Sequence, residues 1–547
     1  MPFQLITAMG VTSEFCSIKD LSFIVDPDAD SKLVQGVTFE LMGNCGMSFC
    51  APLNAASKQT LTDRLSKYDS DIKVDWNDFN DWLEKIENNK PSINVAAQLG
   101  HGVLRAYVMG MKAVSATPED IEGMKKVVRS SIDQGILGFS TGLWYAPGSY
   151  SHTEEIVEIT KVVADHDLLY SSHIRSESDD ASGLFPAHAE AIEIGRRTGA
   201  KIQISHVKSV GPKFWGRGNE LLEGMYRARE EGIAVAGDQY TYEWSSTPTR
   251  GCMFPRWSLE GGREKTLERL KDKNIREEIK LETINFINRF HGAEGCVLAE
   301  FSNDKRLEGM NLSEISEEFS CTPEEAAMRL YEISEGSFVL HSMEEKDVDT
   351  IGMSDLIAVA SDGNSLRSTG TLSSGKPHTR SYGTNTRFIE DMVVNKKLVP
   401  ISKAIYRMTA LPASRLGLKR RGELKKGYFA DINIFKPEEL REAWKWCRRV
   451  SSKSDKKKAL DADCIVSTSG MMDGGPSIWY LNRLRTDPRN GILLTGYQAR
   501  GSGGRMLLDE GHVPIWDKRT PIDLEVNQFS FSTHAGHSEI VKFAQDC

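Results

Sequence analysis

Six side chains that can take part in chemistry directly follow short apolar runs at well-separated points of the chain. They are Cys45, His101, His173, His206, Tyr240 and Asp362. A thiolate and two imidazoles among them would form a ligand set that zinc prefers, and a carboxylate can serve as a base beside it. Each residue alone has a structural explanation, since a buried Cys, a hydrogen-bonded His and an Asp-Gly turn are all common. Their recurrence at the same position of repeated units favours one shared site.

The elements that must position these residues are seven short β-branched runs. They cover residues 36–45, 92–102, 135–143, 168–175, 201–208, 232–240 and 356–363. Segments between them, such as TEEIVEITKVVADHD, carry apolar residues three and four apart, which predicts helices that cover a sheet. The spacing is mostly close to the roughly 31 residues per unit of an eight-unit barrel, in which residues after the strand ends converge. We therefore predict an α/β fold, a TIM-like (β/α)8 barrel, with a helical insertion at about 255–335.

Composition and charge disfavour several other classes of protein. The chain has 547 residues and a net charge of −9, and a general nucleic-acid or membrane-surface binder needs a basic face instead. It contains no uncharged apolar run of membrane-spanning length, and its first residues, MPFQLITAMGVTSEF, do not resemble an export signal. Nine cysteines without a CxxC pair favour reduced thiols over a disulfide framework, and therefore a cytoplasmic location.

Eight segments of the sequence, taken in order, resemble one protein family. They are GVTFELMGNCGMS, LGFSTGLWYAPGSYSHTEEI, SSHIRSES, AKIQISHVKSVG, DQYTYEWSS, ASDG, KPHTRSYGT and MTALPASRLGLKRRGELKKGYFADINIF. The likeness extends over about residues 20–437, and it is to the N-acyl-D-amino-acid deacylases, or D-aminoacylases, of the amidohydrolase superfamily. The resemblance implies a metal-dependent amidohydrolase that acts on linear amides. Its small-molecule substrates would be N-acyl-D-amino acids, which it would hydrolyse to a carboxylate and a free D-amino acid.

The same resemblance assigns roles to individual residues. The ligands of Zn²⁺ would be Cys45, His173 and His206. The catalytic acid would be Asp362. The groups that hold the substrate's carboxylate and its surroundings would be Lys208, Tyr240, Ser246 and Arg380. An Arg fork with hydroxyl donors suits the recognition of a carboxylate. For His101 we expect a structural hydrogen bond rather than a ligand role.

The start of the chain departs from the family pattern. Members begin with a strand that ends in His-x-His, but alignment on Val25-Asp26-Pro27 puts Cys16 and Ile18 at those positions. Because Ile cannot bind a metal, we expect a barrel that is incomplete at its first strand and a site for one metal ion, with activity that this loss could impair. The barrel unit is expected to span 1–440, with a remnant of the family's β-sandwich at about 415–437.

The C-terminal part of the chain resembles a different family. A charged linker is expected at 441–462, and residues 463–547 resemble the RNA-processing β-CASP nucleases of the metallo-β-lactamase fold. The resemblance rests on DCIVSTSGMMDGGPSIWYLNRLRTDPRNGILLTGYQARGSGGRML and FSFSTHAGHSEIVKFA. His534 matches one zinc ligand of that family, but the sequence lacks its HxHxDH cluster, and one ligand does not hold a catalytic metal. Two alternatives to a deacylase follow: an RNA nuclease or RNA-binding module in this α/β fragment, or a catalytically silent fusion.

Overall fold

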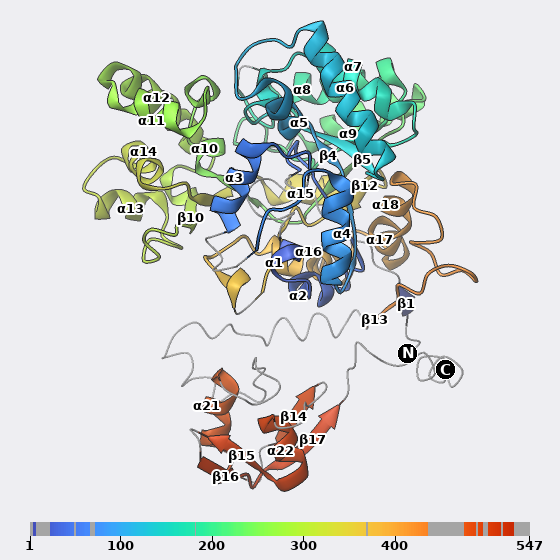
Figure 1. Ribbon diagram of the computed structural model, residues 1–547, viewed down its shortest axis with the longest axis vertical. Helices are drawn as coiled ribbons and strands as arrows, with labels where there is room; N and C mark the ends of the chain where they lie inside the picture. The colour runs from blue at the N-terminus through green and yellow to red at the C-terminus, as the bar shows by residue number, and fades with distance from the viewer. Residues whose placement is uncertain are drawn as a thin grey trace. The chain divides into compact units, whose positions relative to one another are not determined.

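The computed structural model describes most of the chain and divides it into two compact units. The described residues are 4–6, 22–48, 51–65, 72–180, 182–367, 370–435, 475–487, 491–495, 502–515 and 518–529. The first unit comprises Met1–Lys445 and the second Trp446–Cys547 (Figure 1). Each unit is described by itself.

Parallel strands form the centre of the first unit. They are β2 (Phe39–Met42), β3 (Asn94–Ala97), β4 (Leu99–Gly100), β5 (Gly138–Gly142), β6 (Leu169–His173), β7 (Lys201–Ile204), β8 (Val235–Gln239) and β12 (Ile357–Val359). Six of them are hydrogen-bonded in the order β12-β8-β7-β6-β5-β4, and β2 pairs in parallel with β3. The seven strand segments predicted from the sequence are confirmed, with the second divided into β3 and β4 at Gln98.

Helices alternate with these strands, as a (β/α) barrel requires. They are α3 (Ala55–Leu65), α4 (Phe79–Asn89), α5 (His101–Met109), α6 (Pro118–Asp133), α7 (Thr153–Ala164), α8 (Leu184–Thr198), α9 (Gly218–Glu230), α15 (Glu345–Gly352), α16 (Arg380–Phe388), α17 (Ile401–Met408) and α18 (Ala410–Arg415). Their ends follow from the local sequence. Thr117 and Asp120 form a reciprocal cap at the start of α6, and Gly199 ends α8 in the left-handed conformation.

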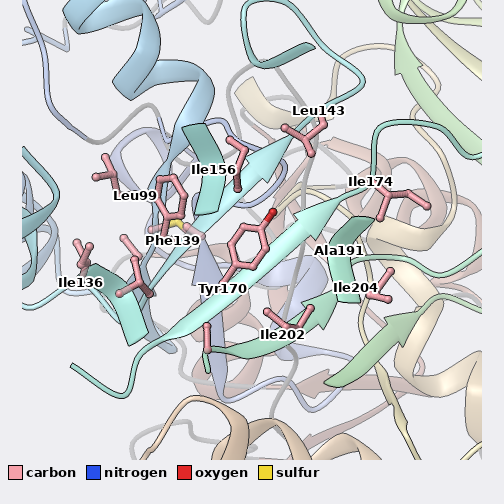
Figure 2. Close-up of a cluster of buried hydrophobic side chains, with 14 of the residues drawn as sticks. Leu99, Ile136, Phe139, Leu143, Ile156, Tyr170, Ile174, Ala191, Ile202 and Ile204 are labelled. Carbon is pink, nitrogen blue, oxygen red and sulfur yellow. The ribbon is translucent and has the colours of Figure 1, made fainter. Parts of the chain in front are cut away.

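The main core lies between the strands and the helices that cover them. Phe139 of β5 and Tyr170 of β6 are fully buried and stacked, with ring centroids 6.1 Å apart. Figure 2 shows them among Leu99, Ile156 and Ala191, which come from β4, α7 and α8. Burial of each large apolar side chain stabilises the fold by roughly 1.5–3 kcal/mol. This packing fixes the strands, and with them the loops that carry the predicted site residues.

The outer edges of β2 and β12 form a seam that side chains bridge. Among the described residues β2 pairs only with β3, β12 pairs only with β8, and no strand joins the two. Helices α1 (Ser22–Val25) and α2 (Asp30–Leu33) precede β2, and Lys32 of α2 is fully buried. Its ammonium donates to Ser361 Oγ at 2.8 Å and lies 3.8 Å from Glu40 Oε1 of β2. Residues 7–21, which precede α1, lie outside the described residues, so the incompleteness of the barrel at its first strand stays a prediction.

Between β8 and β12 the chain leaves the barrel and forms an insertion with its own core. Its elements are β9 (Trp244–Pro248), α10 (Thr249–Cys252), α11 (Arg263–Lys271), α12 (Lys273–Asn288), β10 (Cys296–Glu300), α13 (Leu312–Glu318), α14 (Pro323–Ile333) and β11 (Ser337–His341). The three strands form an antiparallel sheet in the order β10-β11-β9, and Leu298, Met328 and Phe338 belong to one buried cluster. The sequence predicts the helices of this insertion but not its sheet.

One short antiparallel pair joins distant parts of the first unit. Strand β1 (Gln4–Ile6) pairs with β13 (Asn433–Phe435), so that Leu5 faces Ile434. Strand β13 lies within the remnant of a β-sandwich that the sequence predicts at about 415–437, and its partner β1 lies outside that range.

The second unit has a small core of its own. Its described elements are α21 (Gly475–Leu484), β14 (Gly491–Thr495), α22 (Gly503–Glu510), β15 (His512–Ile515), β16 (Lys518–Pro521) and β17 (Glu525–Phe529). Strands β14 and β17 pair in parallel, and Ile478, Leu507 and Val513 are buried together. The predicted linker at 441–462 and His534 lie outside the described residues. Within the described ranges, no helix has the length and apolar character needed to cross a membrane.

Candidate metal centre

Three predicted residues converge at the carboxyl ends of the barrel strands. His173 is the last residue of β6, and His206 and Cys45 follow the ends of β7 and β2 within a few residues. Cys45 Sγ lies 3.3 Å from His206 Nε2, which in turn lies 2.8 Å from His173 Nδ1. All three ligand atoms lie within 4.8 Å of one another, and all three residues are buried. The fold thus brings together a thiol and two imidazoles from separate strands.

The turns after these strands have an unusual backbone conformation. Cys45, His206 and Asp362 all lie in the left-handed region, with φ of 52°, 37° and 44°. Residues other than glycine adopt this conformation rarely, and such strain concentrates at functional sites. Two glycines make the Cys45 turn possible: Gly46 has φ of 74°, and a Cβ on Gly142 would lie 2.0 Å from the Cys45 carbonyl oxygen. The Asn-Cys-Gly sequence therefore turns tightly enough to bring the thiol to the histidines.

Glu177 is a site residue that the sequence analysis did not single out. Its Oε1 lies 3.0 Å from His206 Nδ1 and 3.2 Å from Lys208 Nζ. His206 Nδ1 does not form a hydrogen bond with this carboxylate, but the negative charge at 3.0 Å favours a proton on Nδ1, which leaves the Nε2 lone pair toward Cys45 and His173. A signal was present in the sequence, because Glu177 stands four residues after His173 in the segment SSHIRSES.

Asp238 of β8 holds the loop that carries His206. Its Oδ1 accepts a hydrogen bond from the main-chain N–H of His206 at 2.7 Å, and its Oδ2 accepts one from the Gln203 amide at 2.8 Å. Because both carboxylate oxygens are used in this way, Asp238 positions the histidine loop and is not itself part of the three-ligand cluster.

Burial keeps both histidines of the cluster neutral. It lowers the pKa of His206 to about 3 and lowers the pKa of His173 well below its ordinary value. Burial also raises the pKa of the Cys45 thiol, and the charge of Asp362 adds to that effect. A neutral imidazole offers a lone pair to a metal, whereas a thiol must first lose its proton, which a bound cation promotes.

The donor set fits a metal ion of the zinc type. One sulfur and two imidazole nitrogens suit zinc, and three protein ligands leave a fourth position open in catalytic zinc sites. Ligands at about 2.0–2.3 Å in a tetrahedral site stand roughly 3.3–3.6 Å apart. The separation of 3.3 Å between Cys45 Sγ and His206 Nε2 falls in this range, whereas the 2.8 Å between the His173 and His206 nitrogens is shorter and is a hydrogen-bond distance. The buried Asp362 Oδ1, which has no hydrogen-bond partner among the described residues, adds an acceptor beside the cluster.

The predicted catalytic acid is paired with a predicted carboxylate-binding residue. Asp362 Oδ2 lies 2.6 Å from Arg380 Nη1, and both side chains are almost fully buried. Arg380 Nη2 also donates to the main-chain carbonyl of Ser246 at 3.3 Å, and its main-chain N–H donates to His378 Nδ1 at 2.9 Å. The guanidinium therefore links the acid after β12 to strand β9 of the insertion.

The other predicted substrate contacts lie beside this ion pair. Lys208 Nζ lies 3.5 Å from Tyr240 Oη, and the Arg380 guanidinium lies over the Tyr240 ring at 4.7 Å. Burial opposes the charge of Lys208, but Glu177 and Tyr240 outweigh it and raise the pKa of Lys208 above its ordinary value. The site therefore contains two cations, Lys208 and Arg380, next to the acid.

A small cavity connects these groups. It has a volume of about 50 Å³, and its lining includes His173, His206, Lys208, Ser246 and Asp362. Such a volume holds only a few water molecules. A larger molecule enters only if the groups around the cavity move.

His101 lies apart from the cluster, although it also follows a barrel strand. Its Nε2 lies 2.8 Å from Glu155 Oε1, and Arg105 Nε shares that oxygen at 3.1 Å. His101 and Arg105 are fully buried. The structural hydrogen bond expected for His101 is therefore confirmed.

The C-terminal part of the chain is similar to β-CASP proteins. A model of the Beta-Casp domain matches residues 419–507. The Probable RNase MJ4 of Methanocaldococcus jannaschii is 37% identical over 107 residues, which are 19% of this chain and 25% of that protein. The predicted resemblance of this part is confirmed, and the matched range starts before the expected boundary at 463.

The barrel is similar to deacylases over most of the chain. The N-acyl-D-glutamate deacylase of Alcaligenes xylosoxydans xylosoxydans is 30% identical over 451 residues, which are 82% of this chain and 80% of that protein. The crystal structure of N-acyl-D-glutamate deacylase from Bordetella bronchiseptica, complexed with zinc and a phosphonate inhibitor, is 29% identical, with a TM-score of 0.65 and 80% of each chain covered. A structure of D-aminoacylase reaches a TM-score of 0.63 at 26% identity, again with 80% of each chain covered. The chain therefore belongs to the N-acyl-D-amino-acid deacylases, the D-aminoacylases, of the amidohydrolase superfamily.

Proposed function

We propose that the barrel hydrolyses the amide bond of N-acyl-D-amino acids and releases a carboxylate and a free D-amino acid. The observation that carries this proposal is one constellation: three convergent metal-ligand atoms within 4.8 Å of one another, with a buried carboxylate and two cations beside them. The preference for D substrates and for zinc is supported by the names of the relatives and by the donor set, and not by any chiral feature of the site.

Cys45, His173 and His206 would hold the metal ion. A bound Zn²⁺ supplies Lewis-acid chemistry, since it polarises an amide carbonyl and lowers the pKa of water toward about 7. The charge of Glu177, 3.0 Å from His206 Nδ1, would favour the ring tautomer whose Nε2 lone pair is available to a metal ion. The protein's remaining task is to move one proton and to hold the substrate's carboxylate.

Asp362 would carry that proton. It accepts a proton from the attacking water as the C–O bond forms, and it returns the proton to the nitrogen as the C–N bond breaks. The buried position of Asp362 next to the metal ligands suits this role.

Arg380 would couple substrate binding to this step. Its guanidinium is paired with Asp362 at 2.6 Å. As long as no other carboxylate is present, this ion pair therefore occupies Asp362, the proposed base. A substrate carboxylate competes for the same guanidinium, with Lys208, Tyr240 and the region of Ser246 as further contacts. Binding of the substrate then both opens the small cavity and releases Asp362 for proton transfer.

The site would hold one metal ion. The residues aligned with the family's His-x-His, Cys16 and Ile18, lie outside the described residues, and isoleucine offers no ligand. A related D-aminoacylase structure concerns one-metal activation and second-metal attenuation of a binuclear centre. Loss of a second metal position is therefore compatible with catalysis, and the reduced activity expected from the sequence stays a prediction.

The test is a metal count combined with an assay panel on the full-length protein. We expect stoichiometric zinc in the wild type and hydrolysis of N-acetyl-D-amino acids in preference to their L enantiomers. Cys45→Ser should lose both zinc and activity, whereas Cys296→Ser, which alters a buried thiol outside the cluster, should keep both. A wild-type protein without bound zinc and without hydrolysis of any D substrate would overturn the proposal.

A second candidate function concerns the C-terminal unit. The Beta-Casp match at 419–507 and the relative named as an RNase favour RNA as a partner, and a catalytically silent fragment is the other possibility. RNA cleavage that His534→Ala abolishes would establish the nuclease. RNA binding without cleavage would establish a binding module. If the protein neither binds nor cleaves RNA, the fragment is part of a silent fusion. For the whole chain we propose a cytoplasmic location, because the four cysteines Cys45, Cys252, Cys296 and Cys321 of the described residues are free thiols.

A further inference from the structure

A large cavity lies beside the small cavity of the metal centre. It has a volume of about 660 Å³, within the range of sites that bind small molecules. One wall comes from the barrel side and the other from the insertion. The apolar lining includes Leu53, Val103, Ala106, Phe254, Leu259 and Tyr331.

Two aromatic side chains separate the large cavity from the metal ligands. Trp144, Tyr145 and Gly251 line both cavities, so the two spaces lie on opposite sides of this partition. The Tyr145 ring packs edge-on against the ring of His173, with centroids 4.8 Å apart. The large cavity therefore begins one aromatic ring away from a metal ligand.

The charged groups of the two cavities have different roles. Lys208, the cation proposed to hold the substrate carboxylate, lines the small cavity and not the large one. In the large cavity Arg250 is paired with Glu335 at 2.9 Å, and Arg256 lies over the Trp144 ring at 4.4 Å. A third arginine of the lining, Arg263, donates to the main-chain carbonyl of Tyr331 at 2.7 Å and lies over the ring of the same residue, and Glu300 adds a carboxylate to the lining. These cations are occupied by protein partners, and most of the remaining lining is apolar. The large cavity thus suits an uncharged chain rather than a second carboxylate.

We propose that the large cavity is the subsite for the acyl group, and that the protein acts on N-acyl-D-amino acids with acyl chains much longer than acetyl. This inference rests on the proposed function, because an acyl carbonyl at the metal and a carboxylate at Lys208 and Arg380 leave the acyl tail to extend past Tyr145. An acetyl group would leave most of the large cavity filled with water. Each further methylene that enters the apolar space should increase kcat/KM by about fourfold until the chain reaches the end of the cavity.

The test compares acyl chains of increasing length on one D-amino acid. The acetyl, butyryl, hexanoyl, octanoyl and decanoyl derivatives are assayed with the full-length, zinc-loaded protein below their aggregation concentrations. In parallel, calorimetry measures binding of the free carboxylates from acetate to decanoate, which needs no turnover. We expect kcat/KM and affinity to rise together with chain length.

A cavity-filling variant makes the test specific. Ala106→Phe adds a ring to the wall of α5 and should remove most of the gain for octanoyl and decanoyl chains while it leaves the acetyl substrate unchanged. Ala55→Phe, which adds the same ring at an exposed position of α3, should behave as the wild type. If Ala106→Phe does not fold, the wild-type chain-length series decides alone.

The outcomes separate the two proposals. Hydrolysis that is best with acetyl, and binding that does not depend on chain length, would overturn the acyl subsite and leave the proposed function intact. Chain-length-dependent binding without hydrolysis would support the subsite and contradict the proposed function. A dependence on the amino-acid side chain, with no dependence on acyl length, would assign the cavity to that side chain and overturn the inference.

Discussion

The site residues stand on two different kinds of strand. His173 is the last residue of β6 and His206 follows β7, and each of these strands has parallel partners on both sides. Cys45 and Asp362 follow β2 and β12, each of which has one strand partner among the described residues. The ligand cluster therefore combines residues held by a continuous backbone ladder with residues held at a seam.

Side-chain contacts join the two edges of the seam, whereas backbone hydrogen bonds join the strands of the ladder. Lys32 joins Ser361 and Glu40 across the seam, and Arg367 reaches Asp26 and Asp30 of the preceding segment at 2.9 Å each. A ladder of backbone hydrogen bonds survives most single substitutions, because every residue contributes to it. Side-chain bridges can be removed one at a time. We therefore expect distant substitutions to shift the positions of Asp362 and Cys45 more than those of the two histidines.

The largest expected effect concerns the acid at the seam. Asp362→Asn should lower kcat by about 10²–10⁴-fold, because the amide cannot accept and return a proton. Zinc content should stay at the wild-type level, because the three ligands do not change. Metal analysis and steady-state kinetics on the same preparation check this. Near-wild-type turnover would remove Asp362 from the proton-transfer role.

A substitution of Lys32 breaks the seam itself. Lys32→Met should lower the free energy of unfolding by about 3–5 kcal/mol, because it removes a buried cation from the buried Glu40. Residual activity at a temperature where the variant is folded should also fall, since Ser361 precedes Asp362 and loses its contact with the ammonium. Urea denaturation and kinetics provide the measurements.

The matched control for this variant is an exposed ion pair. Lys403 pairs with Asp355 at 2.6 Å, and both side chains are about half exposed. Lys403→Met should therefore cost less than about 1 kcal/mol. Equal losses in the two lysine variants would mean that the seam is no more sensitive than the surface.

A substitution of Arg380 tests whether this residue, which is paired with Asp362, recognises the carboxylate of the substrate. Arg380→Lys keeps the charge but loses the planar fork, so KM for carboxylate-bearing substrates should rise about 10–100-fold, with a smaller change in kcat. Arg387→Lys on the same helix alters a partly exposed pair with Asp391 and should leave KM unchanged. An unchanged KM in the Arg380 variant would discredit its role as the carboxylate contact.

The sequence predicts well the part of the barrel in which neighbouring strands are joined by backbone hydrogen bonds. The seven predicted strand segments contain the eight parallel strands of the described residues, and the residue types at their ends predict a shared site. The choice of Cys45, His173 and His206 as the ligand set comes from the family resemblance, and the structure brings these three residues together. The physical reason is local, because a side chain one to three residues after a parallel strand has little choice of direction.

The side-chain contacts across the seam, and those that support the site residues, could not be predicted in the same way. The contacts of Lys32 with Ser361, of Glu177 with His206, and of Arg380 with Asp362 join residues that no local pattern relates. The sheet β9-β11 forms from strands separated by helices, and its pairing is likewise a tertiary contact. The prediction for His534 stays untested, because that residue lies outside the described ranges.

The smallest expected effect lies on the ladder side and depends on pH. His188 of α8 is buried, and burial lowers its pKa to about 4. Between this value and the ordinary value of about 6.5, the unfolded state binds a proton that the folded state does not, so stability falls as the pH decreases through this window. From pH 7 to pH 5 the loss of stability from this residue should be about 2 kcal/mol.

His188→Gln should remove that part of the pH dependence, while His166→Gln at an exposed position should retain the wild-type profile. Urea midpoints at the two pH values measure the difference, and parallel profiles for wild type and His188→Gln would show that acid sensitivity arises elsewhere in the fold.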